Sequence, residues 1–168
     1  SIMINTNSEV KGGDFFKKIV NDSAYDFISV KGQWGTQQNF ENKSENVIQF
    51  ENVHDNDLSQ LISAASILLL PSLYESWSIV ASEALSKGLT VLTYDDLPGV
   101  KENCGKAGIY MPRNSTPSDW NQKIEEIKHL RENNLLIRDS LNQNKMNFER
   151  RSKQEKGIIE WVKNFEKK

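Results

Sequence analysis

Hydrophobic residues follow two alternating patterns over the first two thirds of the chain. Short apolar runs recur between polar turns, and segments with apolar residues at helical spacing lie between the runs. Ile67-Leu68-Leu69-Leu70 is short enough to be a strand buried on both faces of a parallel sheet. The runs that predict strands are Ile2 to Asn5, Asp26 to Val30, Val47 to Phe50, Ile67 to Leu70, Leu89 to Thr93 and Gly108 to Met111. Strands that alternate with helices predict an α/β fold with a doubly wound parallel sheet of about six strands.

Helical segments are predicted between these strands, because their apolar residues recur every three or four positions. The apolar stripes run from Phe15 to Val20, from Leu58 to Ala65 and from Ile79 to Leu85. We expect Asn56 to cap the second helix at its N-terminus and Gly88 to end the third. The polar stretch from Gly32 to Asn46, with Trp34 near its start, predicts a surface loop.

From Ser118 onward the pattern is helical to the end of the chain. Ile158, Trp161 and Phe165 belong to an amphipathic stripe near the end. The segment from Lys145 to Lys168 holds eight Lys or Arg residues and four Asp or Glu residues. A solvated helix packed on the domain explains this pattern. A basic helix that faces a membrane, or a surface that docks a further domain, explains it as well.

The composition is that of one soluble globular domain over residues 1–168, with 26% charged and 37% hydrophobic residues. A formal net charge of −2 gives no electrostatic reason to bind nucleic acid. Cys104 is the only cysteine and has no internal disulfide partner, so we expect a cytoplasmic location. The apolar runs are too short to span a membrane, and the first residues do not resemble a signal peptide. Because the chain begins directly on a strand-like run, we expect it to be part of a longer protein.

Glu75 and Glu83 are the first candidates for chemistry, since they lie across an expected strand-to-helix turn. In an open parallel sheet, ligands bind beyond the carboxyl ends of strands, where this turn would lie. A helix N-terminus attracts anionic groups, and the backbone N–H groups from Ser76 to Ile79 would donate to a phosphate. About two helical turns, or ~12 Å, between the carboxylates suit an elongated polar ligand with hydroxyls at both ends. Surface helices carry many glutamates, so the spacing alone does not decide the question.

Lys11-Gly12, after the first strand, is the second candidate, because a lysine at the same edge of the sheet could neutralise a diphosphate. An exposed loop lysine is the alternative interpretation. The turn has neither the glycine pattern of dinucleotide-binding domains nor a Walker-type loop, which argues against an NAD-dependent dehydrogenase. His54 and His129 have no companion ligands, so we expect no metal or other cofactor. Trp34 and Trp77 could pack in the domain or stack on a base or a sugar.

The chain resembles the C-terminal, donor-binding domain of retaining GT-B glycosyltransferases of glycosyltransferase group 1, or family 4. The Glu-x7-Glu motif alone is moderately specific, but the order and spacing of all the blocks are highly specific and cover roughly residues 1 to 130. The blocks are Lys11-Gly12-Gly13-Asp14, Leu70-Pro71-Ser72-Leu73-Tyr74-Glu75-Ser76-Trp77, Glu83-Ala84-Leu85 with Gly88, Val91-Leu92, Pro98-Gly99-Val100-Lys101-Glu102 and Ala107-Gly108-Ile109-Tyr110-Met111-Pro112. The resemblance implies a Rossmann-like domain that forms one half of a GT-B fold.

The resemblance also implies roles for the matching residues. Glu75 would contact hydroxyls of the transferred sugar, Glu83 would bind the ribose hydroxyls of the nucleotide, and Lys11 would balance the charge of the diphosphate. The catalytic residues implied are Glu75 and Lys11. The donor-binding residues implied are Gly12, Ser76, Trp77, Ser78, Ile79 and Glu83. The segments near Gly32 and from Phe50 to Val53 would flank the base. No metal is implied.

The partners implied are a nucleotide-diphosphate sugar and an N-terminal domain of the same enzyme, on which a saccharide or lipid-linked acceptor docks. The chain alone is then expected to turn over no sugar. The full-length protein is expected in the cytoplasm, with possible peripheral association at the inner face of the membrane.

The chain departs from the family pattern in two places. The family commonly has an arginine five or six residues before the lysine, where this chain has Thr6 and Asn5. The family often has glycines where this chain has Ser76 and Ser78. The missing arginine favours an alternative function, a non-catalytic Rossmann-like interaction or regulatory module that has lost transferase activity. The presence of Lys11, together with both glutamates, favours the transferase.

Overall fold

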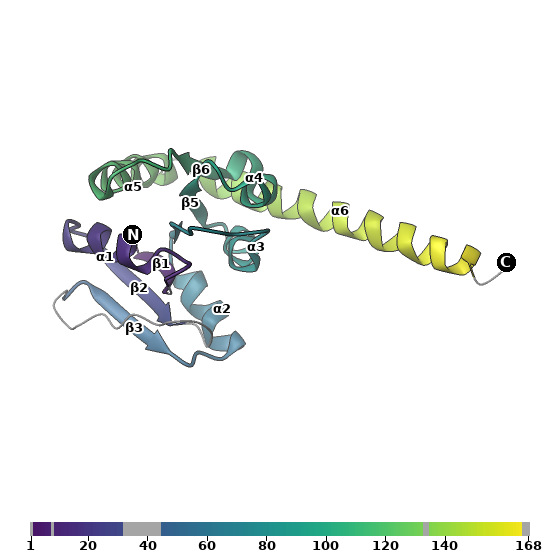
Figure 1. Cartoon of the computed structure of the whole chain (residues 1–168), viewed down its shortest axis with the longest axis horizontal. Helices are drawn as coiled ribbons and strands as arrows, with labels where there is room; N and C mark the ends of the chain where they lie inside the picture. The colour runs from purple at the N-terminus through teal and green to yellow at the C-terminus, as the bar shows by residue number, and fades with distance from the viewer. Residues whose placement is uncertain (1, 8, 32–44, 133–134, 166–168) are drawn as a thin grey trace.

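The computed structural model describes the backbone of residues 2–7, 9–31, 45–132 and 135–165, and side chains within 9–31, 45–132 and 136–160. The expected surface loop, with Trp34, therefore lies almost entirely outside the described residues. Strands and helices alternate over most of the described chain (Figure 1). The elements are β1 (Ile2–Asn7), α1 (Gly13–Asn21), β2 (Asp26–Lys31), β3 (Val47–Glu51), α2 (Asp55–Ala64), β4 (Ile67–Leu70), α3 (Ile79–Ser86), β5 (Thr90–Tyr94), α4 (Pro98–Cys104), a 3-10 turn (Gly105–Ala107), β6 (Gly108–Met111), α5 (Pro117–Glu132) and α6 (Leu135–Phe165).

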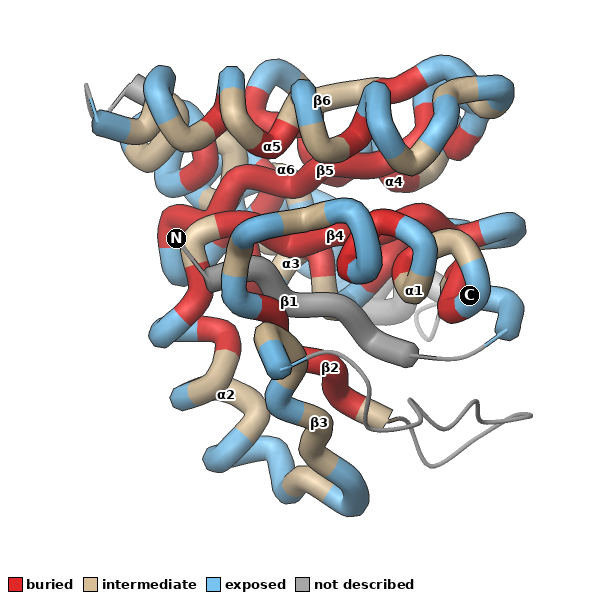
Figure 2. The backbone as a smooth tube through the Cα atoms, turned by 90° about the vertical axis from the view of Figure 1, so that its left-hand side faces the viewer, coloured by how far each residue is buried: buried red, intermediate tan, exposed pale blue. Residues whose placement is uncertain are grey.

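The described strands form one six-stranded sheet in the order β3-β2-β1-β4-β5-β6, and Figure 2 shows them in this order from bottom to top. Every neighbouring pair is parallel. The predicted doubly wound sheet of six strands is therefore confirmed. The strand order reverses between β1 and β4, because β2 and β3 lie on one side of this pair and β5 and β6 on the other. At such a switch, the loops that follow the two strands diverge and leave a crevice at the carboxyl edge of the sheet.

Right-handed crossovers distribute the helices over both faces of the sheet. The β1–β2 connection runs in the opposite direction to the connections after β3, so α1 covers one face and α2, α3 and α4 cover the other. The chain returns to the face of α1 with α5, where the side-chain amide of Asn121 donates to the carbonyl of Ile19 at 3.0 Å.

The core is centred on β4 and β5, which are red in Figure 2. All four side chains of β4 are 0% exposed. Burial of each such side chain contributes about 1.5–3 kcal/mol, which explains why a run without a polar position becomes an interior strand. Trp120 is also 0% exposed, and its ring meets those of Phe15 at 5.6 Å and Tyr94 at 5.2 Å. These edge contacts tie α5 to α1 and to the end of β5.

The prediction that Asn56 caps α2 is wrong. The helix begins at Asp55, and His54 occupies the N-cap position without a side-chain hydrogen bond. The carbonyl of His54 accepts from the N–H of Leu58 at 2.9 Å. Asp55 and Asp57 lie in the first turn, where carboxylates complement the positive end of the helix dipole. The start of α2 is therefore favoured by charge, and not by a side-chain cap.

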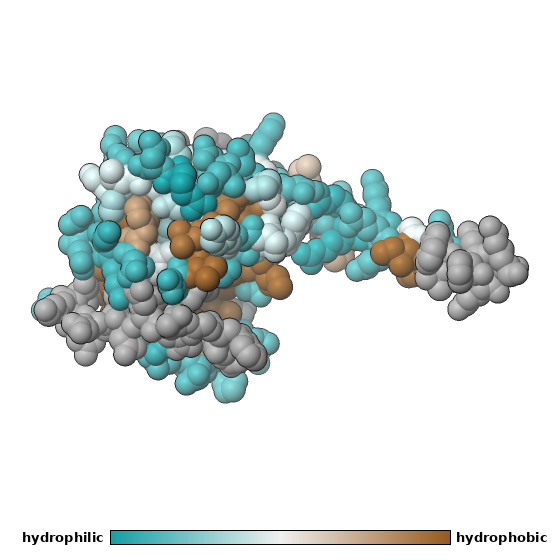
Figure 3. Space-filling view, viewed as in Figure 1, coloured by the Kyte–Doolittle hydropathy of each residue, from teal (hydrophilic) through white to brown (hydrophobic). Residues whose placement is uncertain are grey.

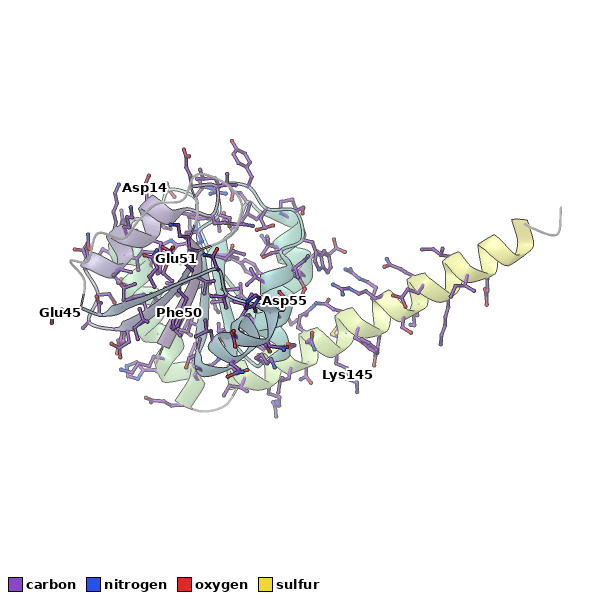
Figure 4. All side chains as sticks on the ribbon, turned by 90° about the horizontal axis from the view of Figure 1, so that it is seen from below. Asp14, Glu45, Phe50, Glu51, Asp55 and Lys145 are labelled. Carbon is purple, nitrogen blue, oxygen red and sulfur yellow. The ribbon has the colours of Figure 1, made fainter. Side chains whose placement is uncertain are left out.

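The last helix, α6, extends away from the rest of the chain (Figure 1) and leaves it near Lys145, which is labelled in Figure 4. Its first part is packed, since Ser140 and Asn147 are buried. Residues 153–160 are all exposed. Ile158, 63% exposed, lies toward the far end, where Figure 3 shows apolar surface. The interpretation that the tail helix packs on this domain is therefore wrong for residues 153–160. Within the described residues, no helix combines the length and hydropathy needed to cross a membrane.

Candidate functional site

The loops after β1 and β4 are fixed to each other at the carboxyl edge of the sheet. Gly12, in the first loop, has a φ of 75°, a left-handed conformation that glycine adopts without strain. It packs against the second loop so closely that a Cβ at this position would lie 2.0 Å from the carbonyl oxygen of Pro71. Nearby, the N–H of Leu73 donates to the carbonyl of Val10 at 2.9 Å. The two loops thus join at the topological switch through backbone contacts.

This junction brings Lys11 and Glu75 together. The ammonium of Lys11 donates to the carboxylate of Glu75, an ion pair between residues that are 64 positions apart. The side chain of Glu75 is 10% exposed and that of Lys11 is 32% exposed. The carboxylate is therefore largely withdrawn from water, whereas the lysine reaches it from the solvent side. The sequence placed both residues at one edge of the sheet, and the structure places them in contact.

Glu75 lines an open groove of about 580 Å³ beside the junction. The loops that follow β4, β5 and β6 form its walls. The lining residues are Leu73, Tyr74, Glu75, Ser76, Asp96, Leu97, Pro98 and Arg113. The groove therefore combines one buried carboxylate with a charged pair and several apolar side chains, a surface suited to a polar ligand with an apolar face.

Arg113 holds one wall of this groove. Its guanidinium donates to the two carboxylate oxygens of Asp96 at 2.8 and 2.6 Å and to the carbonyl of Ser72 at 2.9 Å. It also lies 4.0 Å from the centre of the Tyr94 ring. The hydrogen bonds from Arg113 lower the pKa of Asp96, and those to Asp96 raise the pKa of Arg113, so the pair stays charged at neutral pH. Sequence reasoning missed both residues. Each residue lies shortly after a strand of the sheet. Positions after parallel strands lie together at the carboxyl edge, and this rule could have identified both residues.

The turn into α3 lies next to the groove. Ser78 is the N-cap residue with φ 62° and ψ 94°, a conformation that strains a residue with a Cβ. Ser78 is 4% exposed, and neither its hydroxyl nor the indole N–H of Trp77 has a partner among the described residues. The guanidinium of Arg150 in α6 lies 4.8 Å from the centre of the Trp77 ring. One face of the Trp77 ring is therefore covered by the guanidinium of Arg150 in a cation–π contact.

Glu83 lies in a second, smaller hollow of about 150 Å³ between α2 and α3. The lining residues are Asp55, Leu58, Ser59, Ile62, Glu83, Ser86 and Lys87. Burial raises the pKa of Glu83, and the carboxylate of Asp55, labelled in Figure 4, raises it further. The structure thus does not bring Glu75 and Glu83 into one cavity. Between them in the chain lie Ser76 to Ile79, the segment whose N–H groups open α3.

The remaining candidates add no chemistry to this edge. Among the described residues, no group of three or more His, Cys, Asp or Glu side chains could hold a metal ion. Cys104 is 0% exposed, and burial raises the pKa of its thiol to about 12, so it is not an activated nucleophile. Of the segments expected to flank a base, Gly32 lies outside the described residues, and Phe50 to Val53 follow from the end of β3 toward α2. Thr6 and Asn5 lie in β1, where only the backbone is described.

A family model for glycosyl transferases group 1 matches residues 30–147, more than half of the chain. The chain belongs to this family. The match contains Glu75, Ser76 to Ile79 and Glu83, but it begins after Lys11 and Gly12. Lys11 and Gly12 lie outside the matched residues, and their contact with the loop after β4 is seen only in the structure. A comparison with curated proteins found no match.

Solved structures of group 1 and other GT-B glycosyltransferases share the fold. Sucrose-phosphate synthase from Thermosynechococcus elongatus aligns with a TM-score of 0.74 and 16% identity, over 95% of this chain and 45% of that one. The pneumococcal O-GlcNAc transferase GtfA, solved with UDP and GlcNAc, aligns with a TM-score of 0.69 and 18% identity, over 95% and 35% of the two chains. A C-terminal domain of a glycosyl transferase group 1 protein from Francisella tularensis aligns with a TM-score of 0.63 and 14% identity, over 88% and 85%. The chain thus spans less than half the length of the first two proteins, and its fold is the Rossmann-like half of a GT-B glycosyltransferase.

Proposed function

We propose that this chain is the donor-binding half of a retaining glycosyltransferase and that it binds a nucleotide-diphosphate sugar at the β1–β4 switch. One observation carries the proposal. The ion pair of Lys11 and Glu75 joins the two loops of the switch, and Glu75 is followed directly in the chain by the residues whose N–H groups open α3. Glycosyl transfer develops negative charge on the departing diphosphate and positive charge on the sugar, and this edge offers groups of both signs for them.

The diphosphate would lie against the start of α3. N–H groups at a helix N-terminus stabilise an anion without a metal, and a lysine adds a point charge. In this proposal the ammonium of Lys11 neutralises charge on the departing diphosphate, and the N–H groups from Ser76 to Ile79 donate to the diphosphate oxygens. Gly12 keeps the loop of Lys11 close to these groups, because its contact with Pro71 leaves no room for a side chain.

The two glutamates would hold the ends of the donor. The carboxylate of Glu75 accepts from Lys11 and has further lone pairs for the hydroxyls of the sugar in the adjoining groove. Glu83, in the hollow between α2 and α3, would accept from the ribose hydroxyls. Both roles orient the donor and involve no transfer of a proton.

The acceptor, a saccharide or a lipid-linked saccharide, would dock on an N-terminal domain of the same protein. The coverage of the solved relatives, 45% and 35% of their chains, supports a second half of this kind. The single cysteine supports a cytoplasmic location. The surplus of Lys and Arg between Lys145 and Lys168 would let the whole protein bind the anionic inner face of a membrane.

Isothermal titration calorimetry of the chain with UDP, GDP and ADP tests the proposal. We expect one of the three to bind and Glu83→Ala to weaken its binding by about 10-fold, since a hydrogen bond to a charged group contributes ~1.5–3 kcal/mol. Glu75→Ala should chiefly weaken the matching nucleotide sugar. Glu126→Ala, which changes an exposed glutamate of α5, is the matched control. A folded chain that binds none of the three nucleotides would refute the proposal.

A further inference from the structure

The turn that opens α3 is held from behind by one buried side chain, Asn103 of α4. Asn103 is 0% exposed. Its amide Nδ2 donates to the carbonyl of Trp77 at 2.8 Å and to the carbonyl of Ser78 at 3.0 Å. Its Oδ1 accepts from the hydroxyl of Ser82, one turn into α3, at 3.1 Å. The carboxamide therefore uses its donors on the turn and its acceptor on the helix that follows.

These bonds help to fix the direction of two N–H groups, together with the N–H of Ser82, which donates to the carbonyl of Ser78 at 3.3 Å. In a trans peptide the C=O and the N–H of one peptide unit point in opposite directions, and the described chain has no cis peptide bond. The carbonyls of Trp77 and Ser78 share their peptide units with the N–H groups of Ser78 and Ile79. Because Asn103 draws both carbonyls toward α4, both N–H groups point away from α4. Neither has a hydrogen-bond partner among the described residues.

The conformation held in this way is not one that the turn adopts by itself. Ser78 has a positive φ of 62°, which strains any residue other than glycine. A second contact from α4 supports the turn, since a Cβ on Gly99 would lie 1.7 Å from the carbonyl oxygen of Ser76. Contacts from two residues of α4 therefore hold the backbone of the turn in its strained conformation at Ser78.

The long helix α6 completes the arrangement. The amide of Asn147, 8% exposed, donates to the carbonyl of Asn103 at 2.9 Å and to its Oδ1 at 3.0 Å. With Ser82 and Asn147 both donating to Oδ1, the carboxamide of Asn103 has one orientation that satisfies its partners. The orientation of the N–H groups at the start of α3 thus depends on a residue in α6, 44 positions after Asn103.

We propose that Asn103 is a positioning residue for the diphosphate of the donor and that Asn147 of α6 keeps Asn103 in its working orientation. The inference rests on the proposed function. Asn103 touches no ligand in this scheme. It acts through the N–H groups of Ser78 and Ile79, which it aims at the diphosphate oxygens, so its effect is confined to ligands that carry a diphosphate.

The test measures binding of the chain to the nucleoside diphosphate that binds most tightly and to the corresponding nucleoside. Asn103→Leu and Asn147→Leu remove the two carboxamides at similar volume. Asn121→Leu is the matched control, because Asn121 also donates to a backbone carbonyl but lies on α5, away from the turn. Circular dichroism establishes that each variant is folded, and ¹H–¹⁵N NMR follows the N–H signals of Ser78 and Ile79 as the diphosphate is added.

We expect Asn103→Leu to weaken the diphosphate by about 10-fold or more and the nucleoside by less than about twofold, since only the diphosphate loses charged hydrogen bonds. Asn147→Leu should weaken the diphosphate less, by about three- to fivefold, and Asn121→Leu should not change it. The N–H signals of Ser78 and Ile79 should shift with the diphosphate in the unchanged chain and less in Asn103→Leu. If Asn103→Leu does not fold, Asn147→Leu decides the question.

Two results would overturn the inference while the proposed function stands: diphosphate affinity unchanged in both variants, or equal losses for the diphosphate and the nucleoside. If the chain without substitutions binds no nucleoside diphosphate, the proposed function itself is refuted. The two failures can therefore be distinguished.

Discussion

Replacement of Gly12 by alanine is the most direct test of the junction between the loops after β1 and β4. The substitution adds one methyl group at a position with two separate restrictions. The φ of 75° is left-handed, and the new Cβ would lie 2.0 Å from the backbone carbonyl oxygen of Pro71. A backbone oxygen cannot turn aside as the end of a flexible side chain can, so the loops must separate.

The expected loss of stability combines these two effects. A left-handed conformation costs an L-residue about 1–2 kcal/mol, and insertion of a methyl group into a filled contact costs a further ~1–3 kcal/mol. We therefore expect Gly12→Ala to lower the free energy of unfolding by about 2–5 kcal/mol. For a chain of this length each 1 kcal/mol lowers Tm by about 2–4 °C. The same separation should move Lys11 from Glu75 and weaken binding of the donor.

Two other glycines serve as controls in the same urea and thermal unfolding series. Gly88 has a similar φ of 74°, but the atoms nearest to a Cβ there belong to side chains: Cγ2 of Ile137 at 3.1 Å and Cγ and Cδ2 of Leu141 at 3.8 and 3.9 Å. Gly88→Ala should therefore cost about 1–2 kcal/mol, the conformational part alone. Gly157 lies in α6 with nothing within 4 Å of an added Cβ, and Gly157→Ala should stabilise the helix by ~0.5–1 kcal/mol. Equal losses for Gly12→Ala and Gly88→Ala would refute the claim that the contact with Pro71 limits residue 12.

Two further predictions concern titratable groups. Burial and Asp55 raise the pKa of Glu83 above its ordinary value of 4.5, so the folded chain binds the proton more tightly than the unfolded chain. The stability of the fold therefore falls as pH rises from the unfolded-state pKa through the folded-state pKa. Glu83→Gln should raise Tm more at pH 7 than at pH 4, and equal shifts of Tm in a fluorimetric melt would contradict this. The thiol of Cys104, with a pKa of about 12, should react with a thiol reagent at pH 8 on the order of 10³-fold more slowly in the folded chain than in urea. A folded-state rate near that of a small-molecule thiol would show that Cys104 is accessible.

The strands could be predicted from the sequence because each depends on a local pattern that burial enforces. The apolar run of β4 has no polar position, and such a run is stable only between two covered faces. The start of α2 could not be predicted in the same way, because the helix begins after His54 without a side-chain cap, and the usual preference for a residue such as Asn56 at the N-cap does not apply. The apolar stripe at the end of α6 was also uninformative, since its pattern is the same whatever surface covers it.

Part of the candidate site could be predicted for a similar reason. Lys11 and Glu75 both follow buried strands, and a parallel sheet gathers such positions at one edge. Asn103 could not be predicted from the sequence, since an asparagine near the end of a short helix is a common feature whose partners are not evident. Those partners are the carbonyls of Trp77 and Ser78, in the turn before α3, and the amide of Asn147 in α6. Contacts of this kind depend on tertiary packing and leave no local pattern.

The position of β1 in the sheet affects how this domain could be shortened for study. A protein cut to the family match, residues 30–147, would lose β1 and most of β2. Because β1 lies between β2 and β4, the cut would turn β4 into an edge strand whose four side chains are all apolar. An apolar edge with unpaired N–H and C=O groups is a template for strands of other molecules. Aggregation, and not merely loss of Lys11, is the expected fate of such a fragment.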